Sequence, residues 1–204
     1  MATKGEQTRD NVLNIAEKLI LQKGFSATSI DEVIQQSGLT KGGFFYHFKN
    51  KNDLARHIMV RYKIEDRIFF EGLFERAAEL SDDPLQQMLI FVKLLSEAMA
   101  NLGTTHPGCL VASYTYESEQ YDPEIKGLAA DVVLDWREMF VTQLDRVAEK
   151  YPAKETVSSE ELADMLSSII EGGIVVARVL SNKDILVQQL LQYRCYLKLL
   201  YSGK

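Results

Sequence analysis

The sequence predicts an all-α protein, and three observations carry this prediction. Apolar residues recur at helical spacing along most of the chain, and no segment of any length alternates apolar and polar residues as a half-buried strand does. Ser, Thr, Asn and Asp stand directly before several of these segments, where such residues cap helix N-termini. Gly and Pro lie between the segments and interrupt them. Together these patterns predict about nine helices in 204 residues.

Three short helices are expected at the N-terminus. Ser29 and Glu32 fit a Ser-x-x-Glu capping box that opens the second helix. Gly38 supplies the left-handed residue of a tight turn, and Thr40 caps the third helix, which carries an aromatic run at residues 44–48. The first helix is amphipathic and ends near Gly24, as indicated by Val12, Ile15, Ala16, Leu19 and Ile20.

Six longer helices are expected after these three. Asn50 or Asn52 opens the fourth helix, and Ser158 or Ser159 caps the eighth. We place the domain boundary between residues 50 and 51, which gives a helix-turn-helix domain over 1–50 and an effector-binding and dimerisation domain over 51–204. The approximate spans of helices four to nine are 51–80, 85–101, 109–119, 123–151, 159–180 and 184–201.

Composition and charge narrow the classes of function. Lys and Arg exceed Asp and Glu by nine to six over residues 1–62, a net charge of +3, whereas the whole chain carries −6. A basic N-terminal quarter on an acidic protein is typical of local contact with phosphates. No apolar run approaches the ~20 residues that cross a bilayer, so no membrane partner is expected. Cys109 and Cys195 are too few and too far apart for a disulfide framework or zinc site, which favours a reducing cytoplasm.

The most informative segment is the pair of short helices around Gly38. A short helix whose first turn is small and basic, here Lys41-Gly42-Gly43, fits the major groove of DNA. The segment therefore predicts a helix-turn-helix that binds double-stranded operator DNA. The alternative is a helical adaptor that has lost DNA binding, against which the basic residues Lys41 and Lys51 argue.

The stretch Leu-Thr-Lys-Gly-Gly-Phe-Phe-Tyr-His-Phe-Lys-Asn-Lys at residues 39–51 resembles the tetracycline-repressor-type (TetR) family of transcriptional regulators. The resemblance implies an N-terminal DNA-binding domain, a helical body that binds a small-molecule effector, and a homodimer formed by the last two helices. It also implies repression that ends when the effector binds, with activation in a minority of such proteins. Carried over to this chain, the expected DNA-binding residues are Thr28, Ser29, Gln36, Thr40, Lys41, Gly42, Gly43, Phe45, Tyr46, His47 and Lys51.

Two positions depart from the family pattern. Phe45 stands where the family usually has a tyrosine, so Tyr46 is the candidate to supply a phosphate-binding hydroxyl. Gly43 stands where a small side chain usually reaches a base, which leaves Lys41, with Gln35 and Gln36, as candidates for base contacts. DNA shape would then carry part of the specificity.

The effector pocket is expected among aromatic residues of the body, although most such residues fill a core. Glu171 is the candidate polar group, with a salt bridge to Arg178 as the alternative. Cys109 follows Gly108 at a predicted helix N-terminus, a position that favours a reactive thiolate; a buried structural cysteine is the alternative. The candidate pocket residues are Phe70, Phe91, Cys109, Tyr114, Trp136, Phe140 and Glu171.

The last two predicted helices are apolar on more than one face, which predicts a two-fold interface with a second copy of the chain. The alternative is that both faces are buried within one subunit. No phosphate-binding loop, metal-ligand spacing or serine elbow is present, so neither an enzyme nor a cofactor or metal is expected. The candidate interface residues are Leu166, Ile170, Ile174, Leu186, Leu190, Tyr193 and Leu197.

Overall fold

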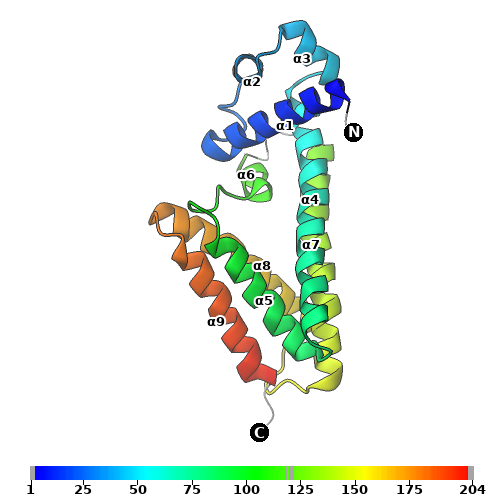
Figure 1. Ribbon diagram of the computed structural model, residues 1–204, viewed down its shortest axis with the longest axis vertical. Helices are drawn as coiled ribbons and strands as arrows, with labels where there is room; N and C mark the ends of the chain where they lie inside the picture. The colour runs from blue at the N-terminus through cyan, green and yellow to red at the C-terminus, as the bar shows by residue number, and fades with distance from the viewer. Residues whose placement is uncertain (1–2, 118, 120–121, 202–204) are drawn as a thin grey trace. The chain divides into compact units, whose positions relative to one another are not determined.

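The computed structural model describes residues 3–117, 119 and 122–201. Over these residues it contains nine α-helices and no strand, which confirms the all-α prediction (Figure 1). Within the same residues, no helix combines the length and the hydrophobicity that crossing a membrane requires. The helices are α1 (Lys4–Lys23), α2 (Ile30–Ser37), α3 (Lys41–His47), α4 (Lys51–Leu80), α5 (Pro84–Ala100), α6 (Leu110–Tyr116), α7 (Pro123–Lys150), α8 (Ser159–Val179) and α9 (Asp184–Tyr201).

The chain forms two compact units. The first comprises Met1–Glu65 with Gly108–Val132, and the second comprises Asp66–Pro107 with Val133–Lys204. Helices α4 and α7 therefore contribute residues to both units, and α6 belongs to the first. The functional boundary that we place between residues 50 and 51 stays a prediction.

Capping side chains set the helix ends of the first unit largely as the sequence predicts. Gly38 ends α2 in the left-handed conformation, with φ of 68°, and the Thr40 hydroxyl accepts a hydrogen bond from the Gly43 N–H at 3.1 Å. Asn50 caps α4 by accepting from the Asp53 N–H at 2.8 Å. The capping box at α2 is only half formed, because Ser29 accepts from the Glu32 N–H while the Glu32 carboxylate pairs with Lys23 instead.

The core of the first unit fixes the helix-turn-helix. Phe44 and Phe48 are fully buried, with ring centroids 5.6 Å apart, and Val33 of α2 is buried as well. The apolar face of α1 is buried at Val12, Leu13, Ala16, Leu19 and Ile20. Because Phe44 points inward from the short helix α3, its neighbours on the opposite face of α3 point to solvent.

In the second unit, α9 packs against both α5 and α8. Ser158 forms a complete capping box with Glu161, which selects one of the two N-caps predicted for α8. Gly173 lets α8 approach α9 closely, because a Cβ there would lie 2.7 Å from Leu186 Cδ1. The Tyr193 hydroxyl donates to the Leu162 carbonyl at 2.9 Å and so ties the two helices together.

Candidate functional site

Helix α3 presents exposed polar and aromatic side chains on one surface. Tyr46 is 85% exposed and Phe45 is 43% exposed, although both lie one or two residues from the fully buried Phe44. Lys41 and Thr40 at the start of the helix are also exposed, and His47 is half-buried. Two adjacent exposed aromatic side chains beside a basic residue form a surface that a partner could cover. We call the exposed residues Gln36, Thr40, Lys41, Gly42, Phe45 and Tyr46 the reading surface.

The two glycines of α3 differ in their surroundings. A Cβ at Gly42 would meet nothing within 4 Å, so the fold does not require glycine at this position. A Cβ at Gly43 would lie 3.4 Å from Thr40 Oγ1, which is a close contact with the capping hydroxyl. The absence of a side chain at Gly42 therefore allows close approach by another molecule rather than by the protein itself.

The N-terminal end of α2 offers a second group of polar atoms in the first unit. Ser29 is exposed at the N-cap, where unpaired N–H groups and the helix dipole favour an anion. Thr28 differs from its expected role as a phosphate ligand, because its side chain is only 3% exposed and its hydroxyl donates to the Gly24 carbonyl at 2.8 Å. Thr28 shapes the turn before α2 instead of facing solvent.

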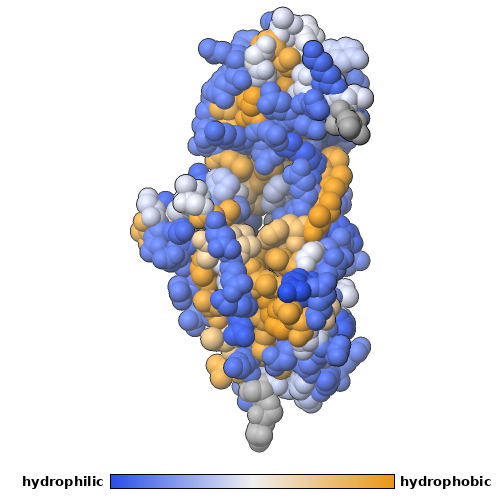
Figure 2. Space-filling view, viewed as in Figure 1, coloured by the Kyte–Doolittle hydropathy of each residue, from blue (hydrophilic) through white to orange (hydrophobic). Residues whose placement is uncertain are grey.

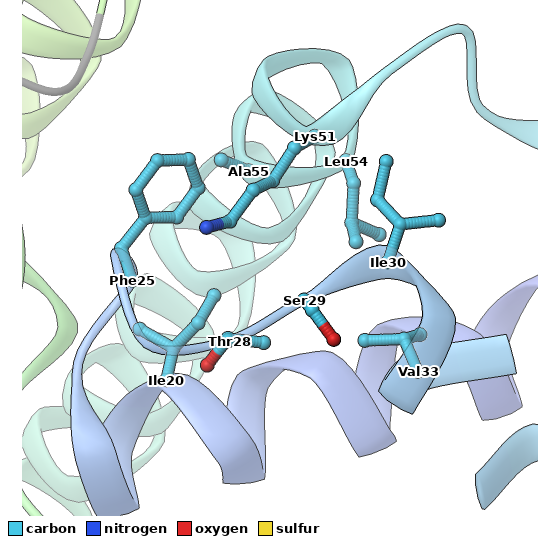
Figure 3. Close-up of a pocket in the computed structure, with 9 residues that line it drawn as sticks. All are labelled: Ile20, Phe25, Thr28, Ser29, Ile30, Val33, Lys51, Leu54 and Ala55. Carbon is cyan, nitrogen blue, oxygen red and sulfur yellow. The ribbon is translucent and has the colours of Figure 1, made fainter. Parts of the chain in front are cut away.

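Lys51 lies at the start of α4, beside the same turn (Figure 3). Its ammonium lies 4.1 Å from the centroid of the Phe25 ring and 3.4 Å from the Ser26 carbonyl oxygen. Burial lowers the pKa of the Lys51 ammonium, and the negative charge of Glu117 opposes this shift. Lys51 is thus half-buried and held by the protein, so a phosphate would have to share its ammonium with these groups.

Two protein-family models match the sequence of this chain. One, described as bacterial regulatory proteins of the tetR family, matches residues 12–58, which include the reading surface. The other, described as the C-terminal domain of LmrA/YxaF-like transcriptional regulators, matches residues 84–189, about half of the chain. The chain belongs to the TetR family. It is therefore a DNA-binding transcriptional regulator and not an enzyme.

Individual TetR-family proteins agree over nearly the full length. The uncharacterized regulator YxaF of Bacillus subtilis is 25% identical over 184 residues, which cover 90% of each chain. LmrA of Bacillus subtilis is 24% identical over 189 residues, 86% of this chain and 88% of LmrA. A TetR-family regulator from Agrobacterium tumefaciens has the same fold, with a TM-score of 0.79 at 19% identity over 98% of this chain and 100% of that one.

The candidate effector residues of this TetR-family chain fall into different groups. Cys109 and Tyr114 belong to the first unit, whereas the other five belong to the second. Phe70, Phe91 and Phe140 are buried against one another with centroids 5.3–6.2 Å apart, and Phe74 stacks on Phe91 at 3.8 Å. The three predicted phenylalanines thus form an aromatic core.

A partly buried polar pair lies in the second unit of this TetR-family chain. The Trp136 indole N–H donates to the Asp66 carboxylate. Burial raises the pKa of Asp66 to about 6; the hydrogen bond from Trp136 opposes this rise, and the negative charge of Glu171 adds to it. Glu171, the predicted polar group, therefore lies within electrostatic reach of Asp66, a residue that the sequence analysis missed. The signal was available, because Ile58, Tyr62, Asp66 and Phe70 follow one another at intervals of four on α4.

Cys109 stands at the N-cap of α6 as expected, with no side-chain capping bond. It is only 4% exposed, and its Sγ lies 3.7 Å from the hydroxyl of Tyr62. Such burial is typical of a packed cysteine and limits the access of a reagent to its thiol. Cys195 is exposed on α9.

The predicted dimer residues require a correction. Six of the seven are buried within this one TetR-family chain, where they pack α8 and α9 against their neighbours, and Ile170 is half-buried. The apolar period predicted for α8 and α9 is present, but these residues lie on the inward face of the helices and not on the outward one. Figure 2 shows apolar side chains at the surface of the second unit. On the last two helices the exposed apolar residues are Met165, Val175, Val176, Val179 and Leu199.

Proposed function

We propose that this regulator is a homodimeric repressor that acts in the cytoplasm, binds a near-palindromic operator and is released by a small-molecule effector. The observation that carries the proposal is the reading surface, a basic and aromatic face on α3 that the protein itself leaves uncovered. Lys41 and the backbone at Gly42 and Gly43 enter the major groove, where Lys41 and Gln36 contact base edges. The small first turn of α3 allows this close approach.

The flanking residues hold the protein on the DNA backbone. Tyr46, His47 and the N-cap Ser29 contact phosphates, and Phe45 packs against the sugar-phosphate backbone. Lys51 contributes positive charge at the start of α4, while Thr28 acts indirectly by holding the turn before α2. Contacts of this kind fix position and orientation, whereas sequence is read at base edges and through DNA shape.

The homodimer forms through the outward face of α8 and α9. Met165, Gly172, Val176 and Val179 are exposed and follow one another at intervals of three to seven on α8, so they share one face. Gly172 lies on this face with nothing within 4 Å of a built Cβ, which allows two copies of α8 to pack closely. A two-fold dimer presents two helix-turn-helix motifs to half-sites about 34–36 Å apart.

The effector acts by differential affinity for two states of the dimer. Helix α4 runs without a break from Lys51 to Leu80, and so connects the DNA-binding residues to the body. The hydrogen-bonded pair of Asp66 and Trp136, with Glu171 within electrostatic reach, supplies polar groups that orient a ligand.

The cysteine at position 109 points to thiol-reactive compounds as the class of effector. The Cys109→Ser variant tests this class: we expect it to bind DNA as wild type does, but N-ethylmaleimide should no longer release it. Cys195→Ser is the matched control and should still be released. If N-ethylmaleimide still releases Cys109→Ser from DNA, Cys109 is a buried structural cysteine and not a sensor.

Selection from a pool of random duplexes tests the function as a whole. Binding, recovery and sequencing should enrich a near-palindrome with half-sites about one helical turn apart. Enrichment of a single, non-repeated half-site contradicts the dimer. No enrichment contradicts sequence-specific binding and favours the helical adaptor.

A further inference from the structure

Glu117 directly follows α6 and bonds to a segment more than 90 residues away in the chain. Its carboxylate accepts hydrogen bonds from the main-chain N–H groups of Phe25 and Ser26, each at 2.8 Å. These two residues form the connection between α1 and α2, which we call the α1–α2 turn (residues 24–28). All of these groups belong to the first unit.

Two main-chain N–H groups of the α1–α2 turn donate to this carboxylate, and other hydrogen bonds of the turn come from its own neighbourhood. The Gly24 N–H donates to the Ile20 carbonyl, the Gly24 carbonyl accepts from the Thr28 hydroxyl, and the Phe25 carbonyl accepts from the Thr28 N–H. The Ser26 carbonyl accepts from Lys51. The Phe25 and Ser26 N–H groups of the turn both donate to Glu117. Because Phe25 is buried, loss of its acceptor would leave a donor away from water.

Gly24 makes the approach of Glu117 possible. A Cβ at this position would lie 2.4 Å from Glu117 Oε1, and the φ of 89° is one that side chains rarely adopt. The positive charge of Lys51 also stabilises the carboxylate, and its ammonium covers the Phe25 ring (Figure 3). The sequence around residue 24 is thus matched to an acidic group brought in by α6.

Helix α6 is itself fastened to α4. The Tyr114 hydroxyl donates to the Ala55 carbonyl at 3.0 Å, and the Tyr114 ring lies 6.5 Å from that of Phe25. At the other end of α6, the Cys109 sulfur contacts the Tyr62 hydroxyl. A displacement of this short helix therefore moves Glu117 and pulls on the α1–α2 turn.

We propose that Glu117 is a positioning residue for DNA binding. Its carboxylate holds the α1–α2 turn and the N-terminal end of α2 in place, so that a movement of α6 also moves both. The proposal rests on the proposed function, because the end of α2 that it positions carries the phosphate-binding Ser29. It assigns to Glu117 no contact with DNA.

Hydrogen exchange on the full-length protein without DNA tests the contact first. In Glu117→Ala, we expect the amides of Phe25 and Ser26 to exchange about tenfold faster or more, as expected when a charge-assisted acceptor is lost. Glu117→Gln should give a smaller increase, because one amide oxygen can still accept one bond. Glu119→Ala, which removes an exposed acid two residues away, is the matched control and should exchange as wild type does.

Tyr114→Phe tests the link to α6, because it removes only the hydroxyl that donates to Ala55. We expect faster exchange at Phe25 and Ser26 in this variant, and no further increase when Tyr114→Phe is added to Glu117→Ala. Independent, multiplicative effects would overturn the claim that the turn follows α6 through Glu117.

Operator affinity completes the test. Glu117→Ala should bind the selected operator about tenfold more weakly, Glu117→Gln should be intermediate, and Glu119→Ala should match wild type. Unchanged exchange in Glu117→Ala overturns the contact, and faster exchange with unchanged affinity overturns the positioning role. If wild type binds no DNA, the proposed function fails and any exchange effect reduces Glu117 to a structural contact.

Discussion

Asp66 is an acidic residue whose pKa the fold raises, and its replacement by asparagine tests this directly. Burial holds its pKa at about 6, against an ordinary value of 3.8. Because the folded-state pKa is raised, the native chain binds this proton more tightly than the unfolded chain does. Stability from this group is therefore lost as pH rises from about 4 to about 6, and the loss is complete above pH 6.

The magnitude follows from the shift of about two pKa units. At about 1.36 kcal/mol per unit, ionising Asp66 costs the fold up to about 3 kcal/mol at pH 7.5, and about 1 kcal/mol at pH 4.5. Asparagine has nearly the same shape and retains an oxygen that accepts from the Trp136 indole. Asp66→Asn should therefore raise the free energy of unfolding at pH 7.5 by up to about 3 kcal/mol and show a smaller gain at pH 4.5.

Urea unfolding at the two pH values measures this difference. Trp136 is the one tryptophan of the chain, so its fluorescence reports on the Asp66 environment itself, and circular dichroism reports on the helices. Protein concentration must be fixed, because dimer formation contributes to apparent stability. Asp82→Asn is the control, since Asp82 is exposed, and should change neither value. An Asp66→Asn variant that is less stable at pH 7.5, or equally changed at both pH values, would refute the reasoning.

Three further substitutions probe the DNA-binding surface and the dimer. Gly42→Ala should stabilise the fold by up to about 1 kcal/mol, because alanine favours a helix and its Cβ meets open space. The same substitution should weaken operator binding in anisotropy titrations. Unchanged affinity would mean that DNA does not approach α3 closely at residue 42. Val179→Lys places a charge on a residue that is 76% exposed and should weaken the dimer about 100-fold in sedimentation, since both copies lose an apolar contact. The control Leu80→Lys, also at the last residue of a helix, should leave dimer formation unchanged. Dimers that persist in Val179→Lys would mean that the interface lies elsewhere. Lys51→Ala should weaken binding to all duplexes alike and reduce the salt slope by about one; an unaltered slope would leave Lys51 with its contacts to Phe25 and Ser26 alone.

Local features of the fold were predictable from the sequence because their causes are local. The left-handed Gly38, the cap at Thr40 and the capping box at Ser158 each involve residues within four positions of one another. The aromatic residues of α3 were likewise identified from a short local motif, the stretch at residues 39–51. Periodicity likewise located α8 and α9 but could not decide which apolar face points outward.

Contacts between distant segments were not predictable in this way. The sequence around Glu117 does not indicate that its carboxylate bonds to the turn at Phe25. Likewise, the Glu32 carboxylate pairs with Lys23 of another helix instead of completing the expected capping box. Six of the seven effector candidates are buried and Glu171 is half-buried, but the sequence could not separate those of the first unit, such as Cys109, from those of the second. Burial of Thr28 likewise depends on the turn before α2, in which its hydroxyl donates to the Gly24 carbonyl.

The central claim is that the surface of α3 binds DNA in a sequence-specific manner. Fluorescence anisotropy of the purified protein should be measured against duplexes tiled from the region that flanks its own gene, over a salt series, with Lys41→Ala as the control. The account predicts tight, salt-dependent binding to one tile and a clear loss of affinity in Lys41→Ala. Weak binding of equal strength to every tile, unchanged in Lys41→Ala, would contradict it.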